Sequence, residues 1–264
     1  MELNLKDKVA IITGPAKGMG FDITRKFAEE GCRLVLIGRD IAAIDGAADE
    51  IRSLGFEAVT AKCDITEAAD CENAVEIAKK AFGGQIDILV NIAGGSGPIG
   101  KTGAETTADE FDDIISLNVG GCFHTIRAVA STMIEQKSGK IINVGGTFGM
   151  RGRAGRMAYS SSKWGLRGVT KSFALELGPH NINVNYVAPG MVDGPRFREK
   201  VCANMAKQLG ISLEEAAERH ADDYALKRIT QAADVANACL FFASDVSRQV
   251  TGADLAVDGG WAST

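Results

Sequence analysis

The chain has 264 residues, of which 45% are hydrophobic and 24% are charged, and its formal net charge is −5. This composition is ordinary for a soluble globular protein, and the length suffices for one large α/β domain with a full core. The acidic balance argues against a nucleic-acid surface, and no apolar run approaches the ~20 residues that span a bilayer.

The first residues do not have the pattern of a targeting signal. Residues 1–8 are charged and lead directly into an apolar run, unlike a signal peptide. The six cysteines are scattered without a Cys-x-x-Cys pair, and the three histidines complete no metal-ligand pattern. We therefore expect a cytoplasmic protein with reduced thiols, no metal site and neither a membrane nor a nucleic-acid partner.

Short apolar runs alternate with longer helical patterns along almost the whole chain. The candidate strands are Val9–Thr13, Arg33–Ile37, Glu57–Lys62, Ile86–Asn91, Lys140–Val144, Asn181–Val187 and Asp254–Val257. Apolar residues recur at helical spacing in Gly20–Glu30, Ile41–Leu54, Ala68–Ala81, Ala108–Glu135, Ala158–Leu177 and Ala232–Ala243. This alternation predicts an α/β fold, a Rossmann-type doubly wound parallel sheet of about seven strands with helices on both faces.

One long stretch, residues 193–228, interrupts the alternation before the last helix and strand. It is charged and mostly helical in pattern. Long insertions in compact domains are often lids, although some only pack on the surface. We expect a single domain over residues 1–264 in which this stretch is a substrate lid.

The first predicted strand ends in a glycine-rich turn, Thr13–Gly20, and a helix follows. Glycines let the backbone approach a pyrophosphate closely, and a helix N-terminus offers free N–H groups and a favourable dipole. At the first β–α junction of a βαβ unit, such a turn predicts a dinucleotide site.

The end of the second predicted strand indicates which dinucleotide the chain binds. Folds that prefer NAD usually place an acidic residue here to bind the ribose 2′-hydroxyl. This chain has Gly38, with Arg39 beside it and Lys17 in the glycine-rich turn. Two cations and no carboxylate suit a 2′-phosphate, so NADP is favoured over NAD. The alternative is that both cations are only solvated surface groups.

Tyr159 and Lys163 lie four residues apart in the predicted helix Ala158–Leu177. This spacing places them on one helix face, one turn apart. An ammonium group beside a phenol favours the phenolate form, and such a phenol can exchange a proton with an alcohol or carbonyl oxygen. The spacing alone also occurs by chance on solvated helices, so the surrounding motifs have to decide.

Further motifs follow in a fixed order. They are Asp64 after the third strand, Asn91-Ile92-Ala93-Gly94 after the fourth, Asn118 in a predicted helix, Pro189-Gly190 after the sixth strand, and Val257-Asp258-Gly259-Gly260 near the C-terminus. Together with the glycine-rich turn and the Tyr159–Lys163 pair, they resemble the short-chain dehydrogenase/reductase family over essentially the whole chain.

The resemblance implies an NAD(P)-dependent oxidoreductase that acts on CH–OH or C=O groups of a small molecule. Tyr159 would exchange the proton on the substrate oxygen, Lys163 would tune Tyr159 and bind the nicotinamide ribose, and Asn118 would hold a water that links Lys163 to solvent. A homotetramer or homodimer is also implied. The cofactor contacts would be Gly14, Lys17, Gly18, Met19, Gly20, Arg39, Asp64, Asn91, Ala93, Gly94, Tyr159, Lys163, Pro189, Gly190 and Val192.

Two positions depart from the family pattern. The family's catalytic serine lies thirteen residues before the tyrosine, where this chain has Gly146. Losing one such preorganised donor typically costs on the order of 10²–10³ in rate. Thr147 is the candidate replacement, although neighbouring strand residues point in different directions. A threonine that often bonds the carboxamide is replaced by Gly194.

Arginines gather between Gly146 and Tyr159, in Met150-Arg-Gly-Arg-Ala-Gly-Arg156. Arginine forks bind carboxylate or phosphate in bidentate fashion. They predict an anionic substrate such as a keto acid, a sugar acid or an acyl thioester, and Arg196 and Arg198 add to this. The alternative is a subunit interface or a solvated loop.

Three functions remain open from the sequence. The first is an NADP-dependent alcohol dehydrogenase or carbonyl reductase. The second is a non-catalytic NADP-binding sensor or scaffold, which the missing serine favours and the retained Asn118, Tyr159 and Lys163 disfavour. The third is a lyase or epimerase that uses the cofactor transiently.

Overall fold

The computed structural model describes residues 2–263, which form one seven-stranded parallel sheet with the strand order β3-β2-β1-β4-β5-β6-β7. The strands are β1 (Val9–Thr13), β2 (Arg33–Gly38), β3 (Ala58–Lys62), β4 (Ile88–Asn91), β5 (Gly139–Val144), β6 (Ile182–Pro189) and β7 (Asp254–Val257). The predicted Rossmann-type doubly wound sheet is therefore confirmed.

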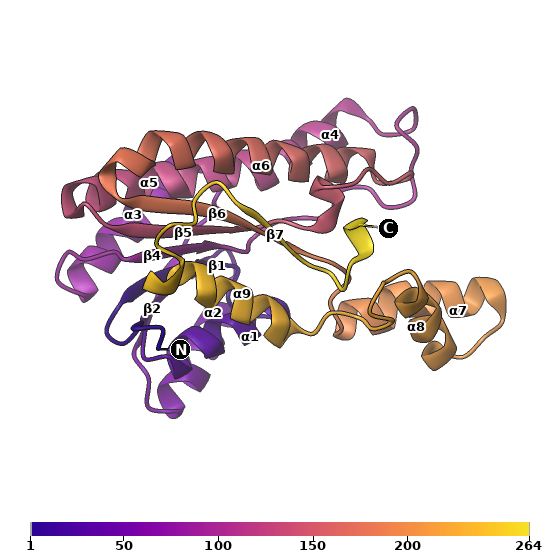
Figure 1. Cartoon of the computed structure of the whole chain (residues 1–264), viewed down its shortest axis with the longest axis horizontal. Helices are drawn as coiled ribbons and strands as arrows, with labels where there is room; N and C mark the ends of the chain where they lie inside the picture. The colour runs from indigo at the N-terminus through magenta and orange to yellow at the C-terminus, as the bar shows by residue number, and fades with distance from the viewer. Residues whose placement is uncertain (1, 264) are drawn as a thin grey trace.

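Helices cover both faces of the sheet. They are α1 (Met19–Glu29), α2 (Ile41–Ser53), α3 (Ala68–Ala81), α4 (Ala108–Ile115), α5 (Gly121–Gln136), α6 (Met157–Leu177), α7 (Ala203–Leu209), α8 (Leu213–Asp222) and α9 (Ala232–Ala243). Figure 1 shows α3, α5 and α6 on one face and α1, α2 and α9 on the other.

Strand alternation divides the core between these two layers. In β1, Ala10 and Ile12 belong to the apolar cluster that includes Phe27 of α1, whereas Val9 and Ile11 belong to the opposite cluster. Successive strand residues point to opposite faces, so a strand covered on both sides has to be apolar throughout. All five β1 residues are buried, which explains why this strand reads as a continuous apolar run.

The long predicted helix 108–135 is not uniform. α4 begins at a capping box in which Thr107 and Glu110 bond each other's backbone N–H groups. Between α4 and α5 the chain forms a π-helical turn, Ser116–Gly120. Such turns are uncommon and frequently occur at functional sites, and this one contains Asn118.

The stretch 193–228 forms a small helical unit beside the main body, at the right of Figure 1. A π-helical segment, Phe197–Cys202, leads into α7 and α8. Phe197 and Cys202 pack against Ala216 and Ala217 in an apolar cluster of their own. A parallel bridge between Val192 and Thr230 joins the two ends of the stretch. The helical pattern is confirmed, and the lid role stays a prediction.

Among residues 2–263, no helix is long and apolar enough to cross a membrane. The same part of the chain holds no group of three His, Cys, Asp or Glu side chains that would bind a metal ion.

Candidate active site

The strand order places the site at the carboxyl ends of β1 and β4. The chain winds outward in opposite directions from these two neighbours, and ligands bind doubly wound sheets at this switch point. The Thr13 hydroxyl accepts hydrogen bonds from the backbone N–H groups of Ile92 and Ala93, each at 2.9 Å. The two loops that border the site are therefore fixed to each other.

The glycine-rich turn needs its glycines for steric reasons. Gly18 has a φ of 52°, in the left-handed region that favours glycine. A Cβ added to Gly20 would overlap the carbonyl oxygen of Gly14, and one added to Gly14 would lie 3.0 Å from the Cα of Ala93. α1 begins at Met19 without a side-chain cap, so its N-terminal backbone is available to an anion. This cradle fits a dinucleotide pyrophosphate.

Arg39 and Asp64 lie at the ends of two neighbouring strands, β2 and β3. The Arg39 Nη1 atom is 3.9 Å from the Asp64 Oδ2 atom. Hydrogen bonds from the backbone N–H and the hydroxyl of Thr66, with the charge of Arg39, outweigh burial and hold the pKa of Asp64 below its usual value. The Arg39 side chain is 70% exposed, so it is free to turn toward a ligand.

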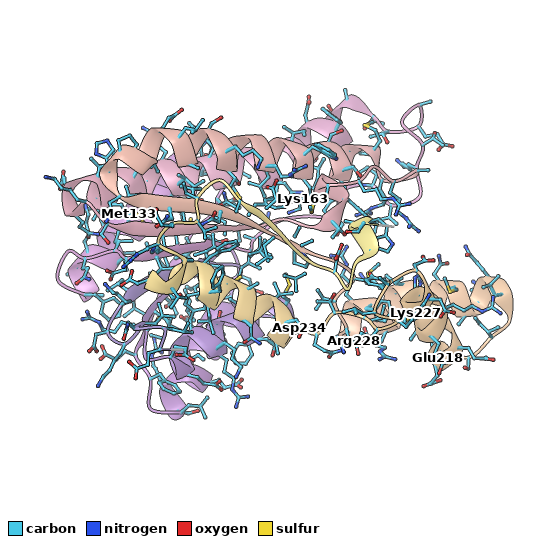
Figure 2. All side chains as sticks on the ribbon, viewed as in Figure 1. Met133, Lys163, Glu218, Lys227, Arg228 and Asp234 are labelled. Carbon is cyan, nitrogen blue, oxygen red and sulfur yellow. The ribbon has the colours of Figure 1, made fainter. Side chains whose placement is uncertain are left out.

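Tyr159 and Lys163 lie on the first turns of α6, on one face as predicted. The Lys163 Nζ atom is 5.6 Å from the centre of the Tyr159 ring. Lys163 is 5% exposed, and Figure 2 labels it between α6 and the sheet. A buried ammonium group beside a half-buried phenol is the arrangement that proton transfer to a bound alcohol requires.

Asn118 connects α6 to the loop after β4. Its side-chain oxygen accepts the Gly95 N–H at 2.8 Å, and its amide nitrogen donates to the Gly95 carbonyl at 3.2 Å and to the Ser162 hydroxyl at 2.9 Å. The Ser162 hydroxyl in turn donates to the Tyr159 carbonyl oxygen at 2.7 Å. Asn118 therefore supports the helix turn that carries Tyr159. Sequence reasoning missed Ser162, whose one signal was a hydroxyl on the buried face of α6.

Position 146 faces the Tyr159 hydroxyl. A Cβ added to Gly146 would lie 3.3 Å from the Tyr159 hydroxyl. Thr147 is buried and begins a short 3₁₀ turn, and the ring of Phe148 meets the ring of Tyr159 edge-on at 6.0 Å. Gly146 therefore places no side chain and no hydroxyl beside the Tyr159 hydroxyl, and Thr147 as a replacement donor stays a prediction.

Tyr186 of β6 lies directly beneath this loop. Its ring occupies the space that a side chain at Gly145 would need, and a Cβ at Gly149 would lie 2.6 Å from its hydroxyl. Tyr186 is fully buried, and burial raises the pKa of its hydroxyl well above the usual value. Sequence reasoning missed this residue, because a tyrosine in a buried strand looks like an ordinary core residue.

Asn91, which was predicted to contact the cofactor, has its side chain inside the fold. It is 2% exposed, and its amide group donates to the Asn143 oxygen at 2.9 Å and accepts from the Thr125 hydroxyl at 2.8 Å. The Asn143 amide in turn donates to the Thr170 hydroxyl at 2.9 Å, so these side chains form a buried row of hydrogen bonds. The side chain of Asn91 therefore supports the sheet rather than facing the cleft.

The turn after β6 is close-packed at Gly190 and open at Gly194. A Cβ at Gly190 would lie 3.0 Å from both the Cβ of Asp258 and the ring of Tyr224. Val192 is held by its bridge to Thr230. A Cβ at Gly194 would have no neighbour within 4 Å, so this glycine leaves room for a larger side chain.

The arginines divide into two groups. The Arg156 Cζ atom lies 4.6 Å from the centre of the Tyr159 ring. Arg198, by contrast, forms two hydrogen bonds with the Asp193 carboxylate, at 2.7 and 2.8 Å. Its charge is therefore neutralised, and the expectation that Arg198 favours an anionic substrate is not supported. Arg156 is the arginine that the fold brings to the tyrosine.

Comparisons with known proteins agree with this geometry. The family model for short chain dehydrogenases matches residues 8–205. The chain is 32% identical over 261 residues to 2,5-dichloro-2,5-cyclohexadiene-1,4-diol dehydrogenase of Sphingobium indicum, which covers 99% of this chain and 98% of the relative. It is 35% identical over 261 residues to galactitol 2-dehydrogenase of Agrobacterium fabrum, with 98% of each chain covered.

Solved structures are similar over the same length. The crystal structure of an actinorhodin polyketide ketoreductase with NADPH has a TM-score of 0.90 and 31% sequence identity, with 98% of both chains covered. That of levodione reductase has a TM-score of 0.89 and 28% identity, covering 98% of this chain and 99% of the other. The similarity therefore extends over the full fold and includes the segment 193–228.

Proposed function

The chain belongs to the short-chain dehydrogenase family and is an oxidoreductase acting on CH–OH or C=O groups, and we propose that its cofactor is NADP and that its substrate carries an anionic group. The observation that carries the redox chemistry is the placement of Tyr159 and Lys163 on one face of α6, at the edge of the sheet where the glycine-rich turn lies. The NADP and anion preferences rest on Arg39 and Arg156.

The proposed chemistry assigns a task to each of these groups. The nicotinamide cofactor, when bound, supplies or accepts the hydride. Tyr159 gives the proton to the substrate oxygen in reduction and takes it in oxidation. Lys163 holds positive charge on the same face of α6 as the phenol, with its Nζ atom 5.6 Å from the centre of the Tyr159 ring. Asn118 keeps the Tyr159 turn in place through Ser162.

The preference for NADP rests on charge at the ends of β1 and β2. Arg39 and Lys17 are exposed cations, and Gly38 places no carboxylate where a 2′-phosphate would lie. Thr66 binds the Oδ1 atom of Asp64, and the Oδ2 atom lies 3.9 Å from Arg39, which is longer than a charged hydrogen bond to a phosphate. The similar ketoreductase structure contains NADPH, which supports the same choice.

The decisive experiment is an assay of NADPH and NADH consumption against ketones, keto acids and acyl thioesters. We expect turnover with NADPH, and the Tyr159→Phe variant should lose roughly 10²- to 10⁴-fold in kcat, the usual contribution of a positioned proton donor. The variant should still bind NADPH, which calorimetry checks. Equal turnover by the Tyr159→Phe variant would contradict the mechanism.

A second candidate function is a non-catalytic NADP-binding sensor or scaffold. The observation that favours it is Gly146, which offers no hydroxyl beside Tyr159. Tight NADPH binding without turnover of any compound in the panel would support this candidate over the enzyme.

We also propose that the protein is a homotetramer or homodimer. Large apolar side chains are exposed on two neighbouring helices, with Phe123 of α5 44% exposed, and Trp164 and Leu175 of α6 49% and 81% exposed. Light scattering coupled to size exclusion measures the mass directly, and a monomer would contradict the proposal.

A further inference from the structure

Two arginines from distant parts of the chain reach the same loop beside Tyr159. Arg156, at the start of α6, donates from Nη1 to the Pro98 carbonyl oxygen at 3.4 Å. Arg196, at the start of the segment 193–228, donates from Nη2 to the Ser96 hydroxyl. Because Ser96 and Pro98 are two residues apart in the loop after β4, both guanidinium groups border one small region.

The positive charge in this region has no counterion within the described chain. Among residues 2–263, neither Arg156 nor Arg196 forms an ion pair, and nor does Arg153, whose Cζ atom lies 5.9 Å from the ring of Phe148. Burial and the charges of Arg196 and Arg153 lower the pKa of Arg156, against an opposing effect of Tyr159. Like charges held together raise the free energy unless an anion joins them.

The direction of Arg156 places such an anion next to the reacting centre. Its guanidinium lies over the ring of Tyr159, with the Cζ atom 4.6 Å from the ring centre. A carboxylate bound by the guanidinium has N–O distances of about 2.7–2.9 Å. The reacting oxygen of the same molecule has to lie about 2.6–3.2 Å from the Tyr159 hydroxyl. One short, rigid molecule can contact both Arg156 and Tyr159 only when a few bonds separate its carboxylate from its reacting oxygen.

We propose that Arg156, assisted by Arg196, forms a carboxylate-binding subsite that selects 2- or 3-hydroxy acids and the corresponding keto acids. This inference rests on the proposed oxidoreductase function. Gly146 places no side chain beside the Tyr159 hydroxyl, where even an added Cβ would lie only 3.3 Å away, so no side chain at this position blocks the approach of the carbinol oxygen. Long acyl thioesters, whose charges lie many bonds from the reacting carbon, do not satisfy this geometry.

The reaction balances without any further reagent. In oxidation, the C–H bond of the carbinol carbon breaks and its two electrons leave with the hydride to NADP⁺, which becomes NADPH. The hydroxyl O–H bond breaks and its proton passes to Tyr159 and then to solvent, which leaves the C=O bond of the keto acid. Arg156 binds the carboxylate throughout and exchanges no proton.

The test compares each acid with its uncharged amide. The probes are 2-hydroxybutanoate, 3-hydroxybutanoate, their amides, and 5-hydroxyhexanoate, in which the carboxylate is further from the alcohol. In the wild type we expect kcat/KM for the better of the two short acids to exceed that of its amide roughly 10- to 100-fold, as for a charged hydrogen bond. 5-Hydroxyhexanoate should behave like an amide.

Variants separate a specific subsite from general positive charge. Arg156→Gln should reduce the ratio of kcat/KM for the acid to kcat/KM for its amide to about one, and Arg156→Lys should restore only part of that ratio, because lysine lacks the planar fork. Arg153→Gln removes an equal charge from the same loop and should lower kcat/KM for the acid much less than Arg156→Gln does. Arg219→Gln, an exposed arginine of α8, should have no effect.

Three kinetic results would overturn the inference: amides that react as well as acids in the wild type, 5-hydroxyhexanoate that reacts as well as the short acids, or an Arg153→Gln loss equal to that of Arg156→Gln. Calorimetry of the short acids with the Tyr159→Phe variant and NADP⁺ separates this inference from the proposed function. Binding that requires Arg156 without turnover in the wild type would retain the subsite and reject the oxidoreductase chemistry on these acids. Absence of binding would reject the subsite.

Discussion

The Tyr186 hydroxyl forms two hydrogen bonds with one residue, Gly146. It donates to the Gly146 carbonyl oxygen at 3.0 Å and accepts the Gly146 N–H at 3.1 Å. Its raised pKa keeps it protonated and able to donate. A residue that no motif marks therefore fixes the backbone at Gly146, where an added Cβ would lie 3.3 Å from the Tyr159 hydroxyl.

Replacing Tyr186 with phenylalanine should affect both stability and rate. The change leaves the buried N–H and C=O of Gly146 without this partner, which typically costs about 1–3 kcal/mol in the free energy of unfolding. A loop displaced by a fraction of an ångström should also lower kcat roughly 10- to 100-fold. Urea unfolding and steady-state kinetics measure the two effects. A variant with wild-type values for both would show that the loop at Gly146 does not need the Tyr186 hydroxyl.

Substitutions at Gly146 should lower activity. The residue has a φ of 155°, which L side chains rarely adopt, and an added Cβ would lie 3.3 Å from the Tyr159 hydroxyl. We expect Gly146→Ala to cost about 1–3 kcal/mol in backbone strain and to reduce kcat/KM for the native substrate.

Gly146→Ser is the matched variant, since it adds the same Cβ together with a hydroxyl. The ratio of its kcat/KM to that of Gly146→Ala isolates the effect of the hydroxyl. We expect both variants to fall below the wild type, because the added Cβ strains the backbone and crowds the Tyr159 hydroxyl. A Gly146→Ser enzyme faster than the wild type would instead mean that the native chain lacks a useful donor.

Arg39→Gln should weaken NADPH binding selectively. Loss of a charged hydrogen bond to the 2′-phosphate is expected to raise the Kd for NADPH at least tenfold and to leave the Kd for NADH nearly unchanged. Arg127→Gln is a suitable control, because Arg127 pairs with Glu72 and both side chains are 56% exposed. Fluorescence titration of both cofactors measures the shift. Equal weakening for NADH would exclude recognition of the 2′-phosphate by Arg39.

The ion pair between Arg167 of α6 and Asp254 of β7 should make stability depend on acid pH. The pair has an Nη2–Oδ2 distance of 2.6 Å, and its side chains are 19% and 13% exposed. Burial opposes ionisation of Asp254, but hydrogen bonds from Arg167 and Lys171 outweigh it and hold its pKa below the usual value.

The sign of the effect follows from this direction. Because the folded-state pKa lies below the unfolded-state value of about 3.9, ionised Asp254 stabilises the fold above that pH. The contribution disappears as the pH falls through the folded-state pKa. Asp254→Asn should therefore cost about 1–3 kcal/mol at pH 7, and the difference from the wild type should shrink below pH 4. Urea unfolding at several pH values checks this, and a constant difference would contradict it.

The sequence predicted the fold well wherever apolar periodicity was strong. The bounds of β1, α3, α9 and β7 agree residue for residue with the predicted ranges. The π-helical turn at Ser116–Gly120 was missed, because inserting a wide turn into a helix changes the backbone bonding while leaving an amphipathic pattern that still reads as helix.

The site was predicted less completely, since motifs identify residues by type and spacing. They brought Tyr159, Lys163 and Asn118 together but gave no sign of Tyr186 or Ser162, whose roles come from contacts across the fold. Arg198 was misjudged for the same reason, because its partner Asp193 can be recognised only once the backbone is known.

The buried polar row through Asn91 and Asn143 sets the position of α6 along the sheet. Every donor in the row points the same way, from Thr125 of α5 to Asn91, then to Asn143, then to Thr170 of α6, and Thr170 ends the row at the Leu166 carbonyl at 2.8 Å. Apolar contacts tolerate small sliding movements, whereas a directed row of hydrogen bonds does not, because one displaced member leaves several buried groups unpaired. Because Lys163 lies on the same helix as Thr170, these amide and hydroxyl bonds also determine how far along the strands Lys163 lies.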